Sequence, residues 1–136
     1  MIFSKMNIKT IAIALFALFI LAACQETLEE RCAREAKEFT TKQCPLQIDA
    51  YTIMDSMTFV PATHTIVYAY TLNGLLDDTT YLNRQNPRQL LLDEIKNSPN
   101  LKLYKEAGYS FRYTYTSTKN KGTKLFEATF HEKDYQ

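Results

Sequence analysis

Two histidines are the residues of this chain best suited to acid–base catalysis. His64 lies in a predicted turn and His131 lies close to the C-terminus. A nucleophilic site would place a serine, cysteine or aspartate at motif spacing from one of them, and the sequence has no such arrangement. We therefore predict two surface histidines, no catalytic residue and no enzyme activity. The alternative is a small hydrolase whose aspartate and histidine meet only in the fold, inside a concave pocket.

The sequence supports a metal site or a phosphate site no better than it supports a catalytic site. Four aspartates lack the regular alternation and the closing glutamate of a calcium loop: Asp49, Asp55, Asp77 and Asp78. Solvated acidic loops are the simpler interpretation. The three glycines of the chain lie too far apart to form a loop that cradles phosphate. We expect no metal site and no cofactor.

Aromatic residues make the best candidate for a binding site. Six of them share one face of two predicted strands: Tyr68, Tyr70, Tyr109, Phe111, Tyr113 and Tyr115. If exposed, such a row would stack on sugars or hold a partner protein, because tyrosine offers a large rigid surface and a hydroxyl. If buried, it is the core beneath the helices. We favour the core, because the opposite face is rich in serine, threonine and arginine and only one face can meet the helices.

Hydrophobic periodicity predicts the elements that position these side chains. Apolar residues recur every three or four positions over residues 27–40, which indicates an amphipathic helix. Pro45 ends the helical region, because proline disfavours helical geometry in the residue before it. A short extended segment at 46–49 leads into predicted strands at 52–60 and 65–72.

The middle of the chain has weaker periodicity. Residues 77–85 fit either a loop or a frayed helical turn. Asn86 and Pro87 favour a helix start, because asparagine caps free amides and proline suits the first helical position. A further helical turn is expected at 101–107, closed by Gly108 in a left-handed conformation.

The clearest strands, 109–118 and 123–131, should form an antiparallel hairpin. The order is then α-β-β-α-β-β. We expect a single small α+β domain with a four-stranded antiparallel sheet and helices packed on one face. Tyr68-Ala69-Tyr70-Thr71 in the first pair of strands is echoed by Tyr113-Thr114-Tyr115-Thr116 in the second, which favours two αββ halves.

The first half of this domain also carries a family resemblance. The residues concerned are Cys44-Pro45, Ile48-Asp49, Thr52, Phe59 and Tyr68-Ala69-Tyr70-Thr71. In these residues the chain resembles small secreted bacterial domains of unknown function. The resemblance implies no catalytic residues.

The N-terminus has the layout of a secretory signal. An uncharged apolar run at 11–23 follows Lys5 and Lys9, and it is shorter than the about 20 residues that a membrane-spanning helix needs. Its end, Leu21-Ala22-Ala23-Cys24, resembles the lipobox of bacterial lipoproteins. That resemblance implies cleavage before Cys24, a diacylglycerol on its sulfur and an acylated amino group.

Lipidation at Cys24 would divide the chain into two parts and determine its cellular location. Residues 1–23 form the signal peptide, and residues 24–136 form the single α+β domain with a short N-terminal tether. Two or more acyl chains hold a protein on a membrane where one would not. Gln25 follows Cys24, in place of the aspartate that retains lipoproteins in the inner membrane, so the resemblance implies the outer membrane and leaves surface exposure open.

With Cys24 lipidated, Cys32 and Cys44 are left as a pair in an oxidising compartment. Two interpretations stay open, a disulfide or two partly buried free thiols. An unbroken helix between them would hold them about 18 Å apart, against about 7 Å for a bridge, so a disulfide requires the chain to double back after about Lys42. Their spacing fits neither a zinc site nor a Cys-x-x-Cys redox pair.

Charge excludes one class of partner. The chain has 16 basic and 15 acidic residues, and losing two lysines with the signal peptide leaves 14 − 15 = −1. Without a basic block, nucleic acid is not an expected partner. We predict a lipid-anchored envelope lipoprotein that acts as a binding module, attached to the membrane through Cys24. An envelope protein is the candidate partner, and the hydrolase alternative would act in the same compartment.

Overall fold

The structure is a computed structural model that describes residues 25–136. The predicted signal peptide and the lipidation site at Cys24 lie outside these residues. Two units divide the chain, Met1–Arg31 and Cys32–Gln136, and the sheet and its core belong to the second. Among the described residues, no helix combines the length and the apolar character that crossing a membrane requires.

The first described helix, α2 (Leu28–Gln43), confirms the amphipathic helix expected at 27–40. A capping box starts it. The Thr27 hydroxyl accepts a hydrogen bond from the Glu30 amide at 3.1 Å, and the Glu30 carboxylate accepts one from the Thr27 amide at 3.0 Å. Cys32 and Ala36 lie on the buried face of the helix.

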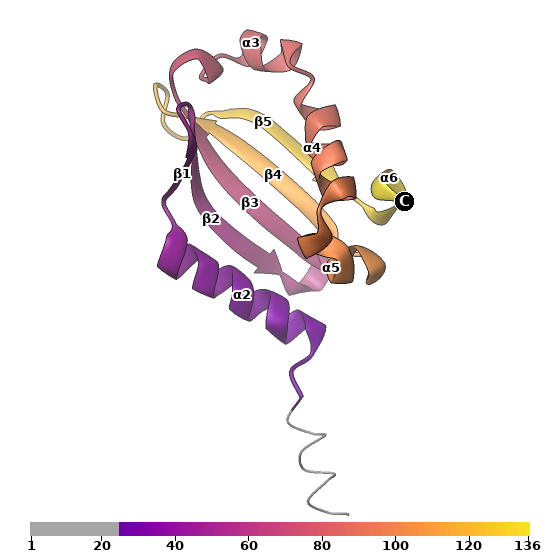
Figure 1. Ribbon diagram of the computed structural model, residues 1–136. Helices are drawn as coiled ribbons and strands as arrows, with labels where there is room; N and C mark the ends of the chain where they lie inside the picture. The colour runs from indigo at the N-terminus through magenta and orange to yellow at the C-terminus, as the bar shows by residue number, and fades with distance from the viewer. Residues whose placement is uncertain (1–24) are drawn as a thin grey trace, which may run out of the picture. The chain divides into compact units, whose positions relative to one another are not determined.

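Five strands form one mixed sheet in the order β1-β2-β3-β4-β5 (Figure 1). Their bounds are β1 Leu46–Asp49, β2 Thr52–Val60, β3 Thr65–Leu72, β4 Ser110–Ser117 and β5 Lys124–Phe130. Neighbouring strands are antiparallel except β3 and β4, which are parallel. The α+β class is confirmed. The predicted four-stranded antiparallel sheet is wrong in the number of strands and in the direction of the central pair.

The connection between β3 and β4 explains the parallel pair. A chain that leaves one end of a sheet must cross back over its face before a parallel neighbour can begin. Three helices make that crossover: α3 (Thr79–Arg84), α4 (Pro87–Asn97) and α5 (Lys102–Glu106). The additional strand is β1, because the segment predicted only as extended pairs with β2.

Local signals explain most of the crossover. The Asp78 side chain caps α3, so residues 77–85 include a helix and are not only a loop. Helix α4 begins at Pro87 as predicted, but Asn86 has a left-handed backbone (φ 51°) and its side chain makes no cap hydrogen bond. After α5, Gly108 has a φ of +76° and gives the predicted left-handed exit.

The helices α2, α4 and α5 lie on one face of the sheet (Figure 1), with α2 toward β2 and α4 toward β4 and β5. A short helix, α6 (Glu132–Tyr135), follows β5. The largest fully buried apolar side chains come from the sheet and α4: Ile66, Leu72, Ile95, Phe111 and Phe130. A bulge at Asp55 shifts the register of β2, so that Met54 and Met57 both face the helices.

Candidate functional site

Four tyrosines form a ladder across the centre of the sheet. The parallel register of β3 and β4 pairs Tyr68 with Tyr113 and Tyr70 with Tyr115. The ring centroids within these pairs are 4.9 and 4.8 Å apart, with interplanar angles of 21° and 11°. The sequence echo noted in the two halves therefore becomes a direct pairing of equivalent residues. We call these four residues the tyrosine ladder.

The flat faces of the ladder rings lie against other side chains. The register of β2 places Met57 beside Tyr68 and Met54 beside Tyr70. On the other side, Tyr115 meets Phe126 at 6.3 Å, and Tyr113 meets the β5 residue Phe130 edge-to-face at 6.1 Å. Side chains stand roughly perpendicular to a sheet, so the hydroxyl ends, not the ring faces, are left for a ligand. This arrangement does not favour the sugar-stacking interpretation.

The ladder hydroxyls have no internal partner. None of the four donates or accepts a hydrogen bond within residues 25–136. No fully buried side-chain oxygen or nitrogen in that part of the chain lacks a partner, so none of these four hydroxyl groups is fully buried. A folded protein leaves polar groups in this state where water or a ligand can satisfy them.

Two grooves lie over the ladder. The first groove, of about 410 Å³, lies between α2 and the α4–α5 region and includes Glu35, Tyr68 and Tyr104 among its lining residues. The second groove, of about 420 Å³, lies between β1 and the start of α4 and includes Asp49 and Tyr115. Both include Tyr70 and Glu94. Each volume is in the range of known ligand sites, about 300–1,000 Å³.

The chemistry of the lining is apolar with acidic groups. Among residues 25–136, every charged residue that lines the two grooves is acidic: Glu35, Asp49 and Glu94. Glu35 accepts a hydrogen bond from the Tyr104 hydroxyl at 2.8 Å, and Asp49 accepts one from a backbone amide at 2.8 Å. Glu94 is exposed, and its carboxylate has no hydrogen bond or ion pair with any other described residue. One carboxylate with no partner among residues 25–136 thus borders both grooves.

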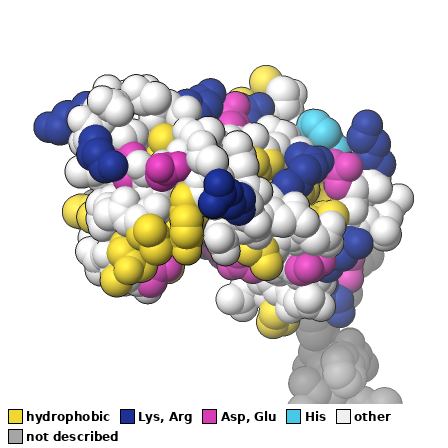
Figure 2. All heavy atoms as spheres, turned by 90° about the horizontal axis from the view of Figure 1, so that it is seen from above, with side chains coloured by type: hydrophobic (Ala, Val, Ile, Leu, Met, Phe, Trp, Pro, Cys, Tyr) yellow, Lys and Arg dark blue, Asp and Glu magenta, His cyan; other side chains and the backbone are white. Residues whose placement is uncertain are grey.

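Figure 2 views the domain from the end that carries α3. Basic and acidic side chains alternate over most of this surface, whereas hydrophobic side chains gather toward its lower left. Exposed large hydrophobic residues include Ile48 and Leu90, and both line the second groove. Apolar surface is therefore available at the mouth of this groove.

The hydroxyls of the ladder stay protonated at neutral pH. Burial and then the Glu94 carboxylate raise the pKa of Tyr70 to about 12. Burial is also the main cause that holds the pKa of Tyr68, Tyr113 and Tyr115 well above the usual value for tyrosine, with Glu94 contributing in each case. Each hydroxyl can therefore both donate and accept a hydrogen bond.

A third groove, of about 280 Å³, lies between α2 and the edge of β2. One of its polar groups, the Thr40 hydroxyl, is already used inside the fold. The Thr40 hydroxyl donates to the Met57 carbonyl at 2.7 Å and accepts from the Met57 amide at 2.9 Å. The hydroxyl takes the place of a neighbouring strand at this point, so we assign this contact a role in stability.

The predicted aromatic face is divided between core and grooves. Tyr109, Phe111 and Tyr113 are buried, as the core interpretation expects. Tyr68, Tyr70 and Tyr115 are only half-buried and line the grooves. Sequence reasoning missed the residues that face them from the helices: Glu35, Glu94 and Tyr104. The available signal was Glu94, a charged residue four positions after Leu90 and three after Leu91 in the apolar stripe of α4.

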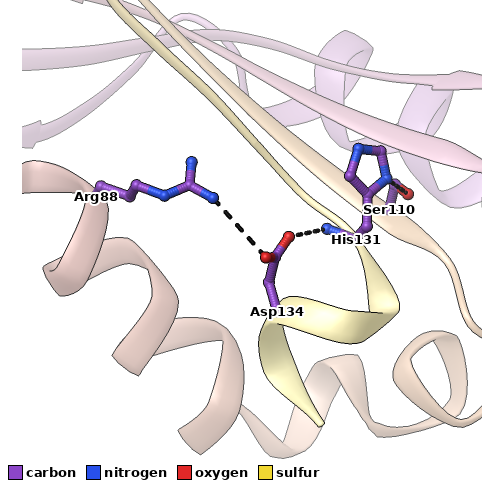
Figure 3. Close-up of polar contacts among 4 residues, drawn as sticks. All are labelled: Arg88, Ser110, His131 and Asp134. Carbon is purple, nitrogen blue, oxygen red and sulfur yellow. Dashed lines mark hydrogen bonds and ion pairs between the residues drawn. The ribbon is translucent and has the colours of Figure 1, made fainter.

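Neither histidine lines these grooves. The exposed His64 ring stacks on Tyr109 at 5.1 Å. His131 starts α6, and its ring Nδ1 lies 2.8 Å from the Ser110 hydroxyl (Figure 3). Its backbone amide, not its ring, donates to the Asp134 carboxylate at 2.8 Å, and that carboxylate lies 4.0 Å from Arg88. The geometry is that of a helix cap, so it lends the hydrolase alternative no support, and that alternative stays a prediction.

The four aspartates considered for a metal site have protein donors in separate places. Asp49 accepts from the Tyr51 amide, Asp55 from the Thr71 hydroxyl and Asp78 from the first turn of α3. Asp77 is buried and accepts from the Ser117 hydroxyl at 2.5 Å and from two backbone amides at the β4–β5 turn. These hydrogen bonds lower the pKa of Asp77.

The two cysteines of the domain are free thiols. Cys32 is buried in the second turn of α2, and Cys44 is half-buried directly after the helix ends. The helix is unbroken between them, so the structure supports the free-thiol interpretation rather than the disulfide. Burial raises the pKa of the Cys32 thiol to about 11, so it is not poised as a nucleophile.

Comparison with known proteins adds the family and the fold but no activity. No curated protein matches the chain. A solved structure described as a "putative secreted protein" from Pseudomonas aeruginosa has the same fold, with a TM-score of 0.63 and 11% sequence identity, over 82% of this chain and 100% of that one. The family model "Domain of unknown function (DUF8479)" matches residues 27–126. The tyrosine ladder and both grooves lie within that span, and the chain belongs to this family.

Proposed function

We propose that the protein is a lipid-anchored binding module of the bacterial envelope, and that its partner binds over the tyrosine ladder. One observation carries the choice of site. Four hydroxyls and the Glu94 carboxylate, none with a hydrogen-bond or ion-pair partner among residues 25–136, line two adjacent grooves. Binding energy is greatest where a partner supplies hydrogen bonds and covers apolar walls together, and this region offers both.

The anchor rests on the lipobox resemblance at Cys24. Mass spectrometry of the mature N-terminus should find a diacylated, N-acylated cysteine, and the chain should fractionate with the outer membrane. A Cys24→Ala variant should keep its leader and fail to fractionate in this way. An unlipidated chain that is released into the medium would contradict the anchor without testing the groove.

Site-specific photo-crosslinking in living cells tests the binding site. The full chain would carry a photo-crosslinking amino acid at Leu90, which is 60% exposed and lines the second groove. The matched control is Leu103, which is 49% exposed in α5 and lines neither groove. We expect a discrete adduct from Leu90 and none from Leu103. Identical adducts from both positions, or none from Leu90, would contradict the proposed site.

A further inference from the structure

We infer that the partner presents an extended, basic segment of polypeptide, with a lysine or arginine paired to Glu94. This inference rests on the proposed function, and it names the chemistry that the grooves select. Three features of the grooves carry it: the sign of their charge, the apolar nature of their walls and the lining residues that they share.

The sign of the charge comes from the lining. Three carboxylates line the grooves, one in the first, one in the second and Glu94 in both. In the part of the chain that the structure describes, no lysine, arginine or histidine lines either groove. An anionic ligand would meet repulsion from all three, whereas ammonium or guanidinium groups would complete an ion pair with a carboxylate that has none. The grooves therefore select cations.

The walls favour basic side chains over small hydrated cations. Beside the carboxylates, the first groove is walled by Met54, Met57 and Ile66, and the second by Leu72, Leu82 and Leu90. Lysine and arginine have apolar stems that pack on such walls while their charged ends reach a carboxylate. A fully hydrated cation would leave this apolar surface uncovered.

The adjacency of the two grooves favours a chain over a single compact molecule. Both grooves share Tyr70 and Glu94, so a ligand that fills both passes Glu94 near its middle. An extended polypeptide repeats its side chains on one face about every 6–7 Å, and its backbone offers both donors and acceptors along its length. The protonated ladder hydroxyls can pair with either kind of group.

Calorimetric titration of the mature lipoprotein in detergent with synthetic peptides tests this inference. The probe is a peptide of about nine residues, about 30 Å when extended, with lysine at alternate positions and alanine between. The controls are the same peptide with glutamine or glutamate in place of lysine, and spermidine as a free polycation. We expect the lysine peptide to bind more tightly than each control.

Variants locate the binding. Glu94→Gln should weaken the lysine peptide by about tenfold or more, because a charge-assisted hydrogen bond is lost. Asp93→Asn removes the same charge one position away on α4, outside both grooves, and should change affinity less than about threefold. Circular dichroism would confirm that both variants are folded.

The outcomes separate the two proposals. Equal binding of the lysine and glutamine peptides, spermidine binding as tight as the lysine peptide, or equal losses in the two variants would overturn the basic-segment inference. If the lysine peptide fails to bind while Leu90 still yields its adduct in cells, this inference falls and the proposed function stands. If both fail, both are wrong.

Discussion

Hydroxyl groups that serve to bind a ligand should contribute little to the stability of the fold. The tyrosine ladder allows this contribution to be measured. Tyr70→Phe and Tyr115→Phe, singly or together, keep the stacked rings and remove only hydroxyls that have no partner in residues 25–136. We expect each change to alter the free energy of unfolding by less than about 0.5 kcal/mol. The matched variant is Tyr135→Phe, because the Tyr135 hydroxyl donates to the buried Tyr109 carbonyl at 2.7 Å.

The magnitude for Tyr135→Phe follows from that one hydrogen bond. Removing the donor takes this hydrogen bond away from a buried carbonyl and costs about 1–2 kcal/mol. The ring itself stays packed edge-on against Phe111 at 5.7 Å, so little apolar burial is lost. For a domain of this size the loss corresponds to a fall in Tm of about 3–8 °C.

Urea unfolding of the purified mature protein, followed by far-ultraviolet circular dichroism, provides the assay. Tyrosine fluorescence gives a second probe, because the chain has no tryptophan. If the ladder variants lose as much stability as Tyr135→Phe, their hydroxyls are part of the fold. The argument that the grooves are a binding site would then fail.

Three further predictions concern single residues. Asp77→Asn should lower the free energy of unfolding at neutral pH, because the fold lowers the pKa of the Asp77 carboxyl. The stability that this carboxylate gives the wild-type protein is lost as the pH falls below about 4. The difference in free energy of unfolding between the two proteins should therefore close at low pH. Cys44 should react with a thiol reagent well before Cys32, which is 1% exposed and has a pKa raised to about 11; mass spectrometry of the labelled protein would show the order, and equal rates would contradict the burial of Cys32. Gly108→Ala should cost about 1 kcal/mol in urea unfolding, because Gly108 has a φ of +76°, which a residue with a Cβ adopts only with strain. An unchanged midpoint would refute that strain.

Periodicity predicted the elements better than their arrangement. The strands expected at 52–60 and 65–72 match β2 and β3 residue for residue. An alternation with period two predicts which side chains of a strand share a face. It does not predict the direction of the neighbouring strand, so the parallel β3–β4 pair was missed. That direction depends on the crossover between β3 and β4. For its first helix, α3, the sequence predicted either a loop or a frayed helical turn. Likewise, β1 has four residues, too few to show alternation.

The candidate site was half visible in the sequence. The aromatic face and the repeated tyrosine motif were both apparent, and their pairing follows from them once the strands are parallel. The acidic residues were not apparent, because Glu94 and Glu35 reach the ladder from two helices that are far apart in the chain. Only tertiary packing tells them apart from the other charged residues on exposed helical faces.

The parallel β3–β4 pair joins two parts of the sheet, and we call the line between these two strands the seam. On one side lie β1, β2 and β3, joined by short turns, and on the other lies the β4–β5 hairpin. Each side can form from local contacts, but the tyrosine ladder exists only after the two sides have paired. A ligand held over Tyr70 and Tyr115 bridges this seam. A bound ligand will therefore raise the free energy of global unfolding by RT ln(1 + L/Kd), where L is the free ligand concentration. Amide exchange should slow across the central strands rather than in one loop.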